Sequence, residues 1–239
     1  MLRRTLGAVR HLNRRALISL LMSLPLLLVA AKCIDNETLY QDSTGDWHVV
    51  GEIHNDTDIW GADMELGGDL LDADGNVIAT TQAPVCPLEL KPHSFDGFDL
   101  HFRHSADLHP ASYAIHVIGG RALDHPLPDS GLSLNGFAAK KESGGIHISG
   151  KVATTRTYKR VLTGCIAFYN SEGRVVTHWT VINFGLTLPL VDGTPQPVSF
   201  TIPDVPAAAT SMKVWLAGDS DTPLASDYAA VMTGSITIH

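Results

Sequence analysis

The chain carries an internal repeat, which constrains its fold more than any other feature of the sequence. Residues 48–53 (HVVGEI) correspond to residues 147–152 (HISGKV) at an offset of 99 residues. Residues 70–77 (LLDADGNV) correspond to residues 168–175 (FYNSEGRV) at an offset of 98 residues. Since further matches follow in the same order, the sequence predicts two copies of one structural unit.

Apolar and polar residues alternate along short segments of both copies. The clearest examples are residues 48–54, 98–103, 113–117 and 146–152. A period of two predicts β-strands that bury one side and expose the other to solvent. On this basis we expect His48 and His101 on solvent-facing sides of their strands. We expect no amphipathic helix after residue 33.

Turn-forming residues separate the predicted strands. The run Asp72–Asn76 resembles the start of an EF-hand calcium loop. Such a loop needs glycine at its sixth position and an acid at its twelfth, where this chain has Val77 and Ala83. The run is therefore predicted to form a hairpin turn in which Gly75 has a positive φ.

The first 31 residues differ in composition from the rest of the chain. They hold five arginines and no acid, so 12 basic side chains face 25 acidic ones elsewhere, a difference of −13. The apolar run Ala16–Ala31 is interrupted by Pro25 and is shorter than the ~20 residues of a membrane-spanning helix. A basic start, a short apolar run and small residues at its end predict a signal peptide over residues 1–31, and therefore export.

The export route stays open at this level. The segment Asn13–Ile18 contains paired arginines followed by apolar residues, as twin-arginine signals do, but the leucine-rich run suits the general secretory route equally well. Cys33 stands where a lipoprotein carries its acylated cysteine, although Lys32 precedes it in place of a small residue. We expect a periplasmic, cell-surface or secreted protein, with membrane contact only through a lipid anchor at Cys33.

The predicted fold class is all-β, with two tandem immunoglobulin-like β-sandwich domains after the signal peptide. The domains are expected over residues 34–139 and 146–239, joined by a polar, glycine-ended linker over residues 140–145. Each copy has about 100 residues, which matches an immunoglobulin-like sandwich and suffices to bury a core.

The cysteines do not fit the disulfide of an immunoglobulin domain, which needs two cysteines in one sandwich. Cys86 falls in the first copy and Cys165 in the second. If Cys33 is unmodified, a Cys33–Cys86 disulfide can tie the N-terminal segment to the first sandwich; if Cys33 is acylated, Cys86 and Cys165 are left over. Cys165 is expected to be a small buried apolar side chain.

The second copy resembles the FxLYD domain, because residues 166–170 (IAFYN) stand where the motif Phe-x-Leu-Tyr-Asp is expected. In the first copy residues 68–72 (GDLLD) precede a similar acidic and glycine-containing turn, while Gly68 and Leu71 depart from the aromatic positions. Members of this family are small immunoglobulin-like modules of secreted and surface proteins in bacteria and archaea. The resemblance implies an extracellular sandwich and no particular chemistry.

Two sets of side chains are candidates for binding. Among twelve histidines, His101, His104 and His109 cluster along the chain and suit copper or zinc, with scattered solvent-facing histidines as the alternative interpretation. The candidates for a binding surface are Trp60, Trp179 and Trp215. Trp215 is out of phase with its apolar neighbours, so either it faces a partner or the other domain covers it.

These features favour a binding module over an enzyme. The chain has no Gly-x-Ser-x-Gly elbow, HExxH motif or Cys-x-x-Cys pair, and its net charge of −8 argues against nucleic acid as a partner. We expect a non-catalytic protein without a cofactor, which binds a protein or glycan partner in the cell envelope or outside the cell in adhesion, interaction or scaffolding. The alternative is a periplasmic copper or zinc protein, and a hydrolase is the third option.

Overall fold

The structure is a computed structural model that describes residues 33–87, 89–155, 161–182, 186, 190, 193–220 and 230–239. The predicted signal peptide lies outside the described residues. No helix within these ranges is long and apolar enough to cross a membrane. Residues Cys33–His239 form one compact unit, built from antiparallel β-sheets.

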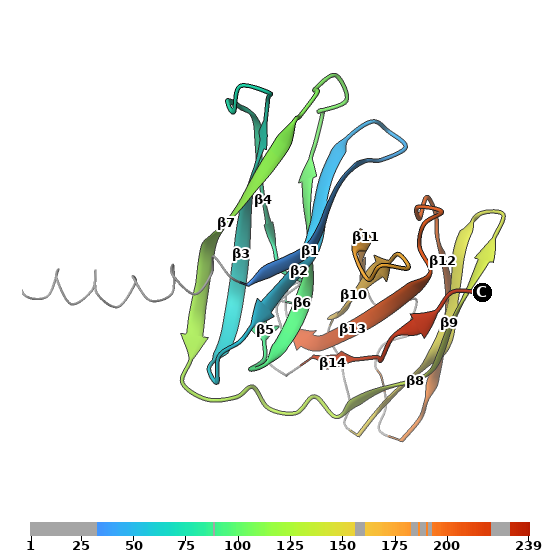
Figure 1. Cartoon of the computed structure of the whole chain (residues 1–239). Coiled ribbons are helices and arrows are strands. Elements are labelled where there is room, and N and C mark those ends of the chain that lie inside the picture. Colours follow the sequence, from blue (N-terminus) through green and yellow to red (C-terminus); the bar gives the residue numbers. More distant parts are fainter. Residues whose placement is uncertain are drawn as a thin grey trace, which may run out of the picture. The chain divides into compact units, whose positions relative to one another are not determined.

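The first half of the described chain is a sandwich of two sheets (Figure 1). One sheet has the order β1-β2-β6, with β1 over Ile34–Gln41, β2 over Trp47–Asn55 and β6 over Ser94–Phe102. The other has the order β4-β3-β5, with β7 also paired to β3. Its strands are β3 (Trp60–Leu71), β4 (Val77–Pro84), β5 (Glu89–Leu90) and β7 (Ser112–Leu123). A core that includes Leu66, Leu70, Phe98 and Leu100 fills the space between the sheets.

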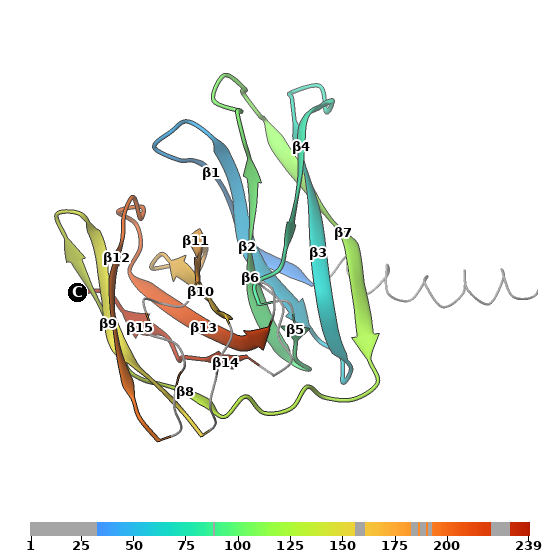
Figure 2. The same cartoon turned by 180° about the vertical axis from the view of Figure 1, so that it is seen from behind.

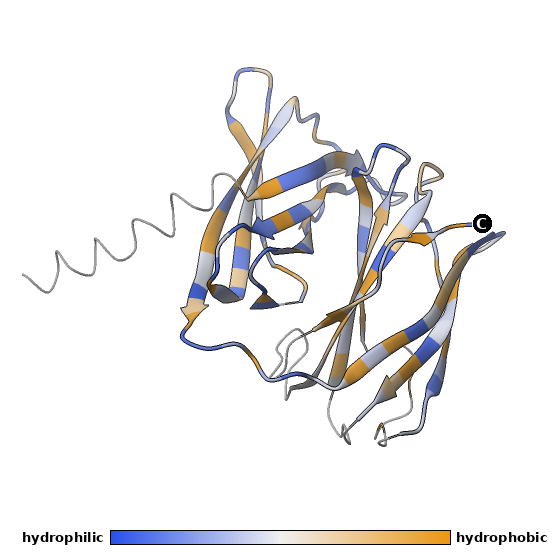
Figure 3. Cartoon of the chain, turned by 60° about the horizontal axis from the view of Figure 1, so that its bottom comes forward, coloured by the Kyte–Doolittle hydropathy of each residue, from blue (hydrophilic) through white to orange (hydrophobic). Residues whose placement is uncertain are grey.

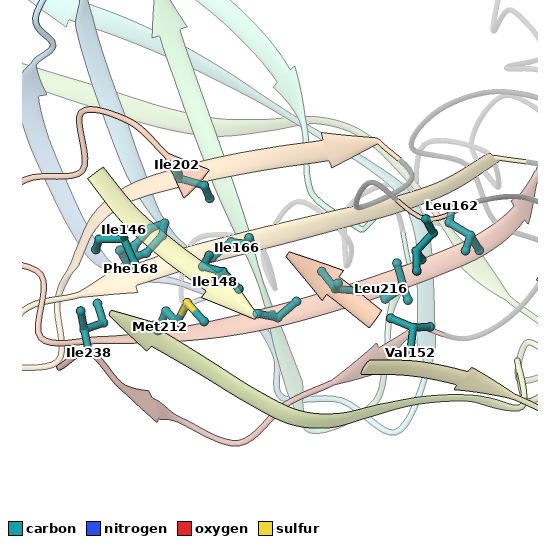
Figure 4. Packing of buried hydrophobic residues seen from close by; sticks show 14 of the residues in the cluster. Ile146, Ile148, Val152, Leu162, Ile166, Phe168, Ile202, Met212, Leu216 and Ile238 are labelled. Atoms are coloured by element: carbon teal, nitrogen blue, oxygen red, sulfur yellow. The ribbon is translucent and has the colours of Figure 1, made fainter. Parts of the chain in front are cut away.

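The second half repeats this plan. One sheet has the order β12-β9-β8, from β8 (Leu132–Glu142), β9 (Gly145–Thr154) and β12 (Gln196–Ile202). The other has the order β11-β10-β13-β14, from β10 (Val161–Tyr169), β11 (Val175–Ile182), β13 (Ser211–Ser220) and β14 (Val231–Met232). Strand β15 (Ile236–Thr237) also pairs with β13. Figure 4 shows the core of this half, where Ile148, Phe168 and Met212 gather between the strands.

The strand order confirms the predicted all-β fold and the repeat. The sheet β1-β2-β6 corresponds to β8-β9-β12, and β4-β3-β7 corresponds to β11-β10-β13. Along the strands, hydrophilic and hydrophobic residues alternate, as the colours of Figure 3 show. This alternation places Val49 and Ile53 of β2 in the first core, as the period of two predicts.

The residues predicted as a linker, 140–145, belong to the hairpin between β8 and β9. Lys141 pairs with Ile146, and Glu142 pairs with Gly145. The connection between the halves is instead the stretch between β7 and β8, residues 124–131, which both views of the chain show (Figure 2). The prediction of a linker at residues 140–145 was wrong because polar, glycine-rich segments are typical of tight hairpin turns as well as of linkers. Gly145 has a φ of +131°, and a Cβ there would lie 2.1 Å from the carbonyl oxygen of Ile202.

Among the described residues, one five-residue hairpin turn occurs three times, at Asp42–Asp46, Asp72–Asn76 and Asn170–Arg174. In each, the Oδ1 atom of the first residue accepts the backbone N–H groups of the third and fifth residues. The fourth residue is glycine, with a φ between +81° and +95°. The predicted turn at Asp72–Asn76, with Gly75 at positive φ, is confirmed.

Candidate functional site

The two sandwiches meet through the sheet faces that their own cores do not use. Strand β11 packs against β1, β2 and β6, and β10 packs against β6. The apolar part of this interface consists of Val50, Cys86, Cys165, Ala167, Tyr169, Val175 and Trp215, with Tyr40 and Phe95 packed against them. Strands β2 and β10 are therefore buried on both faces, so their polar side chains lie inside the molecule.

A disulfide crosses this interface and joins Cys86 to Cys165, whose Cα atoms lie 5.9 Å apart. The predicted pairing of Cys33 with Cys86 is therefore wrong. Cys33 is buried in the first core instead. The sequence could not show the correct pairing, because it depends on which faces of the two sandwiches meet.

A buried carboxylate links the sandwiches beside the disulfide. Glu52 of β2 is 3% exposed, and its Oε1 atom accepts a hydrogen bond of 2.8 Å from the Tyr169 hydroxyl. Asn36 donates to its Oε2 atom at 2.6 Å, and the Lys213 ammonium lies 3.8 Å from Oε1. Burial, together with the charge of Glu52, raises the pKa of Tyr169, and burial lowers the pKa of Lys213. These partners compensate the loss of water around Glu52.

A second polar contact lies at β5. The backbone N–H of Ala230 donates to Glu89, and the Lys91 ammonium donates to the carbonyl oxygen of Ala230. Burial raises the pKa of Glu89 to about 7. Burial also raises the pKa of the neighbouring Asp96 well above its usual range, and the charge of Glu89 adds to this effect. This region therefore holds two buried acids that resist ionisation.

A group of histidines and aspartates lies at the edge of the interface, on β2, β6 and the turn between β1 and β2. His48 and His101 are directly opposite each other in the β2–β6 register, and their rings stack with centroids 4.2 Å apart. The His48 Nε2 atom lies 3.4 Å from Asp42 Oδ2, and its Nδ1 atom lies 2.8 Å from Asp99 Oδ1. Potential metal-ligating atoms of Asp42, His48 and His101 all lie within 4.8 Å of one another.

The electrostatics of this group favour a positively charged His48 beside ionised Asp42 and Asp99. Burial lowers the pKa of His48, but the hydrogen bond and charge of Asp99, and then the contact with Asp42, raise it above its usual value. Burial raises the pKa of Asp42, but hydrogen bonds from Thr44, from the Asp46 backbone and from His48 together lower it. The two ionised carboxylates thus stabilise an adjacent positive charge.

Of the three histidines predicted to cluster, only His101 belongs to this group. His104 and His109 are exposed and lie outside it. His48 was expected on a solvent-facing side but is 7% exposed, since the second sandwich covers that face. His48 and His101 are 53 positions apart in the sequence and meet through antiparallel pairing. A prediction that β2 pairs with β6 would therefore have been needed to identify the group.

The predicted binding tryptophans have different surroundings. Trp215 is 2% exposed and meets Phe95 edge to face at 5.9 Å, so the other sandwich covers it, and Trp215 is not a surface residue. Trp179 is half-buried against the second core. Trp60 is half-buried at the start of β3, with the Lys91 ammonium 6.0 Å from its ring centroid. Trp60 and Trp179 keep part of their surface available.

Comparisons with known proteins assign no family to this chain. No protein-family model matches this chain, and no curated protein matches its sequence. Red sea bream transglutaminase aligns with 90% of this chain at 12% identity and a TM-score of 0.27, over 33% of its own length. A glycosyl hydrolase family 2 member from Bacteroides cellulosilyticus aligns with 81% at 8% identity and a TM-score of 0.30, over 28% of its length. The chain thus spans about a third of these proteins, and its all-β sandwich class rests on its own strand pairing.

Proposed function

We propose that this protein is an exported, non-catalytic binding module in which two immunoglobulin-like sandwiches act as one rigid unit. The observation that carries the proposal is the disulfide Cys86–Cys165, which spans the interface between the sandwiches. Disulfides persist in oxidising compartments, so this bond supports the export predicted from residues 1–31. The protein then works in the periplasm, at the cell surface or outside the cell.

The rigidity has a function in recognition. The disulfide, the Glu52–Tyr169 hydrogen bond and the contacts of Ala230 all connect the two halves. Association costs less entropy when the surfaces that meet a partner are already fixed relative to one another. A fixed pair of sandwiches therefore suits a role in adhesion or scaffolding, with a protein or glycan as the partner.

The binding surface that we favour surrounds Trp60. Its ring is half-buried, and the neighbouring Ile59 is 56% exposed. A tryptophan that is fixed on one side and open on the other offers a large contact area at little cost in side-chain entropy. Lys91 beside the ring adds a positive charge to this surface.

The resemblance to FxLYD domains is part of the proposal. In this chain each of the motif residues has a structural role. Phe168 lies in the second core, Tyr169 bonds Glu52 in the interface, and Asn170 begins a hairpin turn. Each residue stabilises the sandwich or its docking. The motif therefore supports the immunoglobulin-like class and leaves the partner to be found by experiment.

The export and the disulfide are tested together by the intact mass of the full chain, expressed with its own N-terminus in bacteria. We expect a processed protein outside the cytoplasm whose mass increases by two protons on reduction. An added acyl mass would place a lipid on Cys33, whose buried side chain would then have to leave the first core. A full-length cytoplasmic protein with all thiols reduced would overturn the proposal.

The binding surface is tested by Trp60→Ala in a binding assay against envelope fractions and a glycan array. We expect Trp60→Ala to weaken retention at least ~10-fold, in line with the loss of a tryptophan hot spot. The control is Met232→Ala, which removes an exposed apolar side chain on β14. Equal retention of both variants would contradict a role for Trp60.

A further inference from the structure

We propose that Asp42, His48 and His101 form a binding site for one Zn²⁺ ion. The site would lie where the turn between β1 and β2 meets the β2–β6 pair. Two imidazoles and one carboxylate form a common ligand set for zinc, which leaves a fourth position for water or another ligand. The inference goes beyond the proposed binding module and does not depend on it.

The turn fixes Asp42 for this role. Its Oδ1 atom accepts hydrogen bonds from the backbone N–H groups of Thr44 and Asp46, both at 2.9 Å, and from the Thr44 hydroxyl at 2.8 Å. The Oδ2 atom makes none of these bonds and points to His48 Nε2 at 3.4 Å. In the same turn at Asp72, by contrast, Oδ2 accepts the side-chain amide of Asn76. The turn of Asp42 therefore presents a carboxylate oxygen whose direction is already set.

The surroundings of His48 are the strongest evidence for a metal site. Its side chain is nine-tenths buried, and its Nε2 atom is buried without a hydrogen-bond partner. Asp99 lies 2.8 Å from Nδ1, so that nitrogen donates its proton to Asp99, and the lone pair of the neutral ring lies on Nε2. A carboxylate behind a histidine is the usual support of a metal-bound imidazole. A cation bound at Nε2 would replace the second proton whose uptake Asp42 and Asp99 favour, and it would give this buried atom a partner.

His101 supplies the second imidazole from the neighbouring strand. Directly opposed residues on one sheet face have Cβ atoms about 5 Å apart, which allows both rings to reach one ion. The His101 Nε2 atom lies 3.1 Å from Asp46 Oδ2, so Asp46 can orient this ring or take the fourth position. The His101 side chain is 36% exposed, which leaves it room to turn from its stacked position toward the ion.

The distances fit a small tetrahedral ion. Zinc bonds of about 2.1 Å place neighbouring ligand atoms about 3.4 Å apart. The separation of 3.4 Å between His48 Nε2 and Asp42 Oδ2 already has this value, while the whole group spans 4.8 Å. Ca²⁺ and Mg²⁺ require oxygen ligands, so a site with two imidazoles excludes them.

The site is also tied to the second sandwich. Tyr40 stacks on His48 with ring centroids 5.1 Å apart, and its hydroxyl is 2.9 Å from the Thr177 hydroxyl on β11. This contact holds the buried ring of His48 in place from the side opposite His101. Metal binding is thus expected to stabilise a part of the molecule where both sandwiches contribute to the supporting layer.

The proposal is tested by calorimetric titration of the whole purified protein with ZnCl₂ after treatment with a chelator. We expect one Zn²⁺ per chain, and no binding of CaCl₂ over the same concentration range. Asp42→Asn and His101→Gln should each lower the zinc affinity at least ~100-fold, and Asp99→Asn, which removes only the support of His48, about 10–100-fold. The controls His104→Gln and His109→Gln alter exposed histidines outside the group and should change the affinity less than about twofold.

A second measurement keeps the test independent of how well a variant folds. In the wild-type protein, the imidazole NMR signals of His48 and His101 should shift on addition of Zn²⁺, while those of His104 and His109 stay unchanged. Undiminished zinc binding by Asp42→Asn and His101→Gln, or loss of binding in the controls, would overturn the proposal. So would absence of zinc binding in the wild-type protein. None of these outcomes would affect the test of export and disulfide formation.

Discussion

At the scale of single residues, Gly97 allows β6 to approach His178 of β11. A Cβ at this position would lie 2.6 Å from His178 Cδ2 and 2.8 Å from Nε2. The His178 ring is buried, so it has no room to move aside. We expect Gly97→Ala to lower the free energy of unfolding by about 1–3 kcal/mol, measured by chemical denaturation.

Gly144→Ala is the matched control for this substitution. A Cβ there meets nothing within 4 Å, and its backbone does not have a positive φ in the left-handed region. The control should change stability by less than about 0.5 kcal/mol. Equal effects of the two substitutions would show that β6 does not contact His178 closely.

Glu89 gives the stability of the protein a defined dependence on pH. Burial raises its pKa from the ordinary value of 4.5 to about 7, so the folded state binds the proton more tightly than the unfolded state. The stabilisation is complete below about pH 4.5 and is lost as the pH rises through 7. Glu89→Gln removes this titration and keeps an oxygen that can accept the N–H of Ala230. The free energy of unfolding of the variant, relative to that of wild type, should therefore increase by about 3 kcal/mol as the pH rises from 4.5 to 7. It should keep this advantage at higher pH.

The measurement is a pair of denaturation series over this pH range, one for wild type and one for Glu89→Gln. Asp96 and Lys91 are the charged neighbours of Glu89. Because the charge of Glu89 raises the pKa of Asp96, both series are measured in an Asp96→Asn background, so that the titration of Asp96 does not enter the difference. A difference in stability that stays constant with pH would contradict a raised pKa for Glu89.

At the scale of elements, the disulfide connects β10 of the second sandwich to the segment before β5 in the first. It closes a loop with a sequence separation of 79 residues. In the chain-entropy account a loop of this length contributes about 4.5 kcal/mol. The double substitution of Cys86 and Cys165 to serine should lower the free energy of unfolding by about this amount. Denaturation of wild type with and without a reductant should give the same difference, whereas Cys33→Ala should remain sensitive to the reductant.

Much at this scale could be predicted from the sequence, because local patterns determine it. Alternation in residues 48–54 gives β2, and the turn at Asp72–Asn76 follows from its aspartate and glycine. The boundary between the copies was misplaced for a physical reason: Gly144 and Gly145 close a hairpin, and hairpin turns share their composition with linkers. Composition shows that the chain turns, but not whether the next strand pairs with the preceding one.

At the scale of the whole molecule, the sequence could not show which faces are buried between the sandwiches. His48 and Glu52 occupy the polar side of β2, and this side is covered by β11 and its neighbours. Trp215, out of phase with the second core, was compatible with both a covered and a partner-binding face. The group of Asp42, His48 and His101 was missed for a related reason, since its members meet only through strand pairing and a turn.

The hydrogen bond between Glu52 and Tyr169 offers a test of how the two halves dock. Tyr169→Phe removes the hydroxyl that donates to Glu52 Oε1. The buried carboxylate then keeps Asn36, together with the more distant His54 and Lys213. Loss of a partner from a buried charged group should cost about 1–3 kcal/mol of unfolding free energy. Tyr113→Phe, which removes the hydroxyl of a half-buried tyrosine in the first sandwich, should stay within about 0.5 kcal/mol.

A double-mutant cycle assigns this cost to the contact between the sandwiches. Glu52→Gln and Tyr169→Phe are measured singly and together by denaturation. Because the two side chains contact each other across the interface, their effects should deviate from additivity by about 0.5–3 kcal/mol. Additive effects would mean that Tyr169 and Glu52 act separately, each within its own sandwich. A coupling energy in the expected range would establish that two halves repeated in the sequence fold into one docked unit, as a rigid binding module requires.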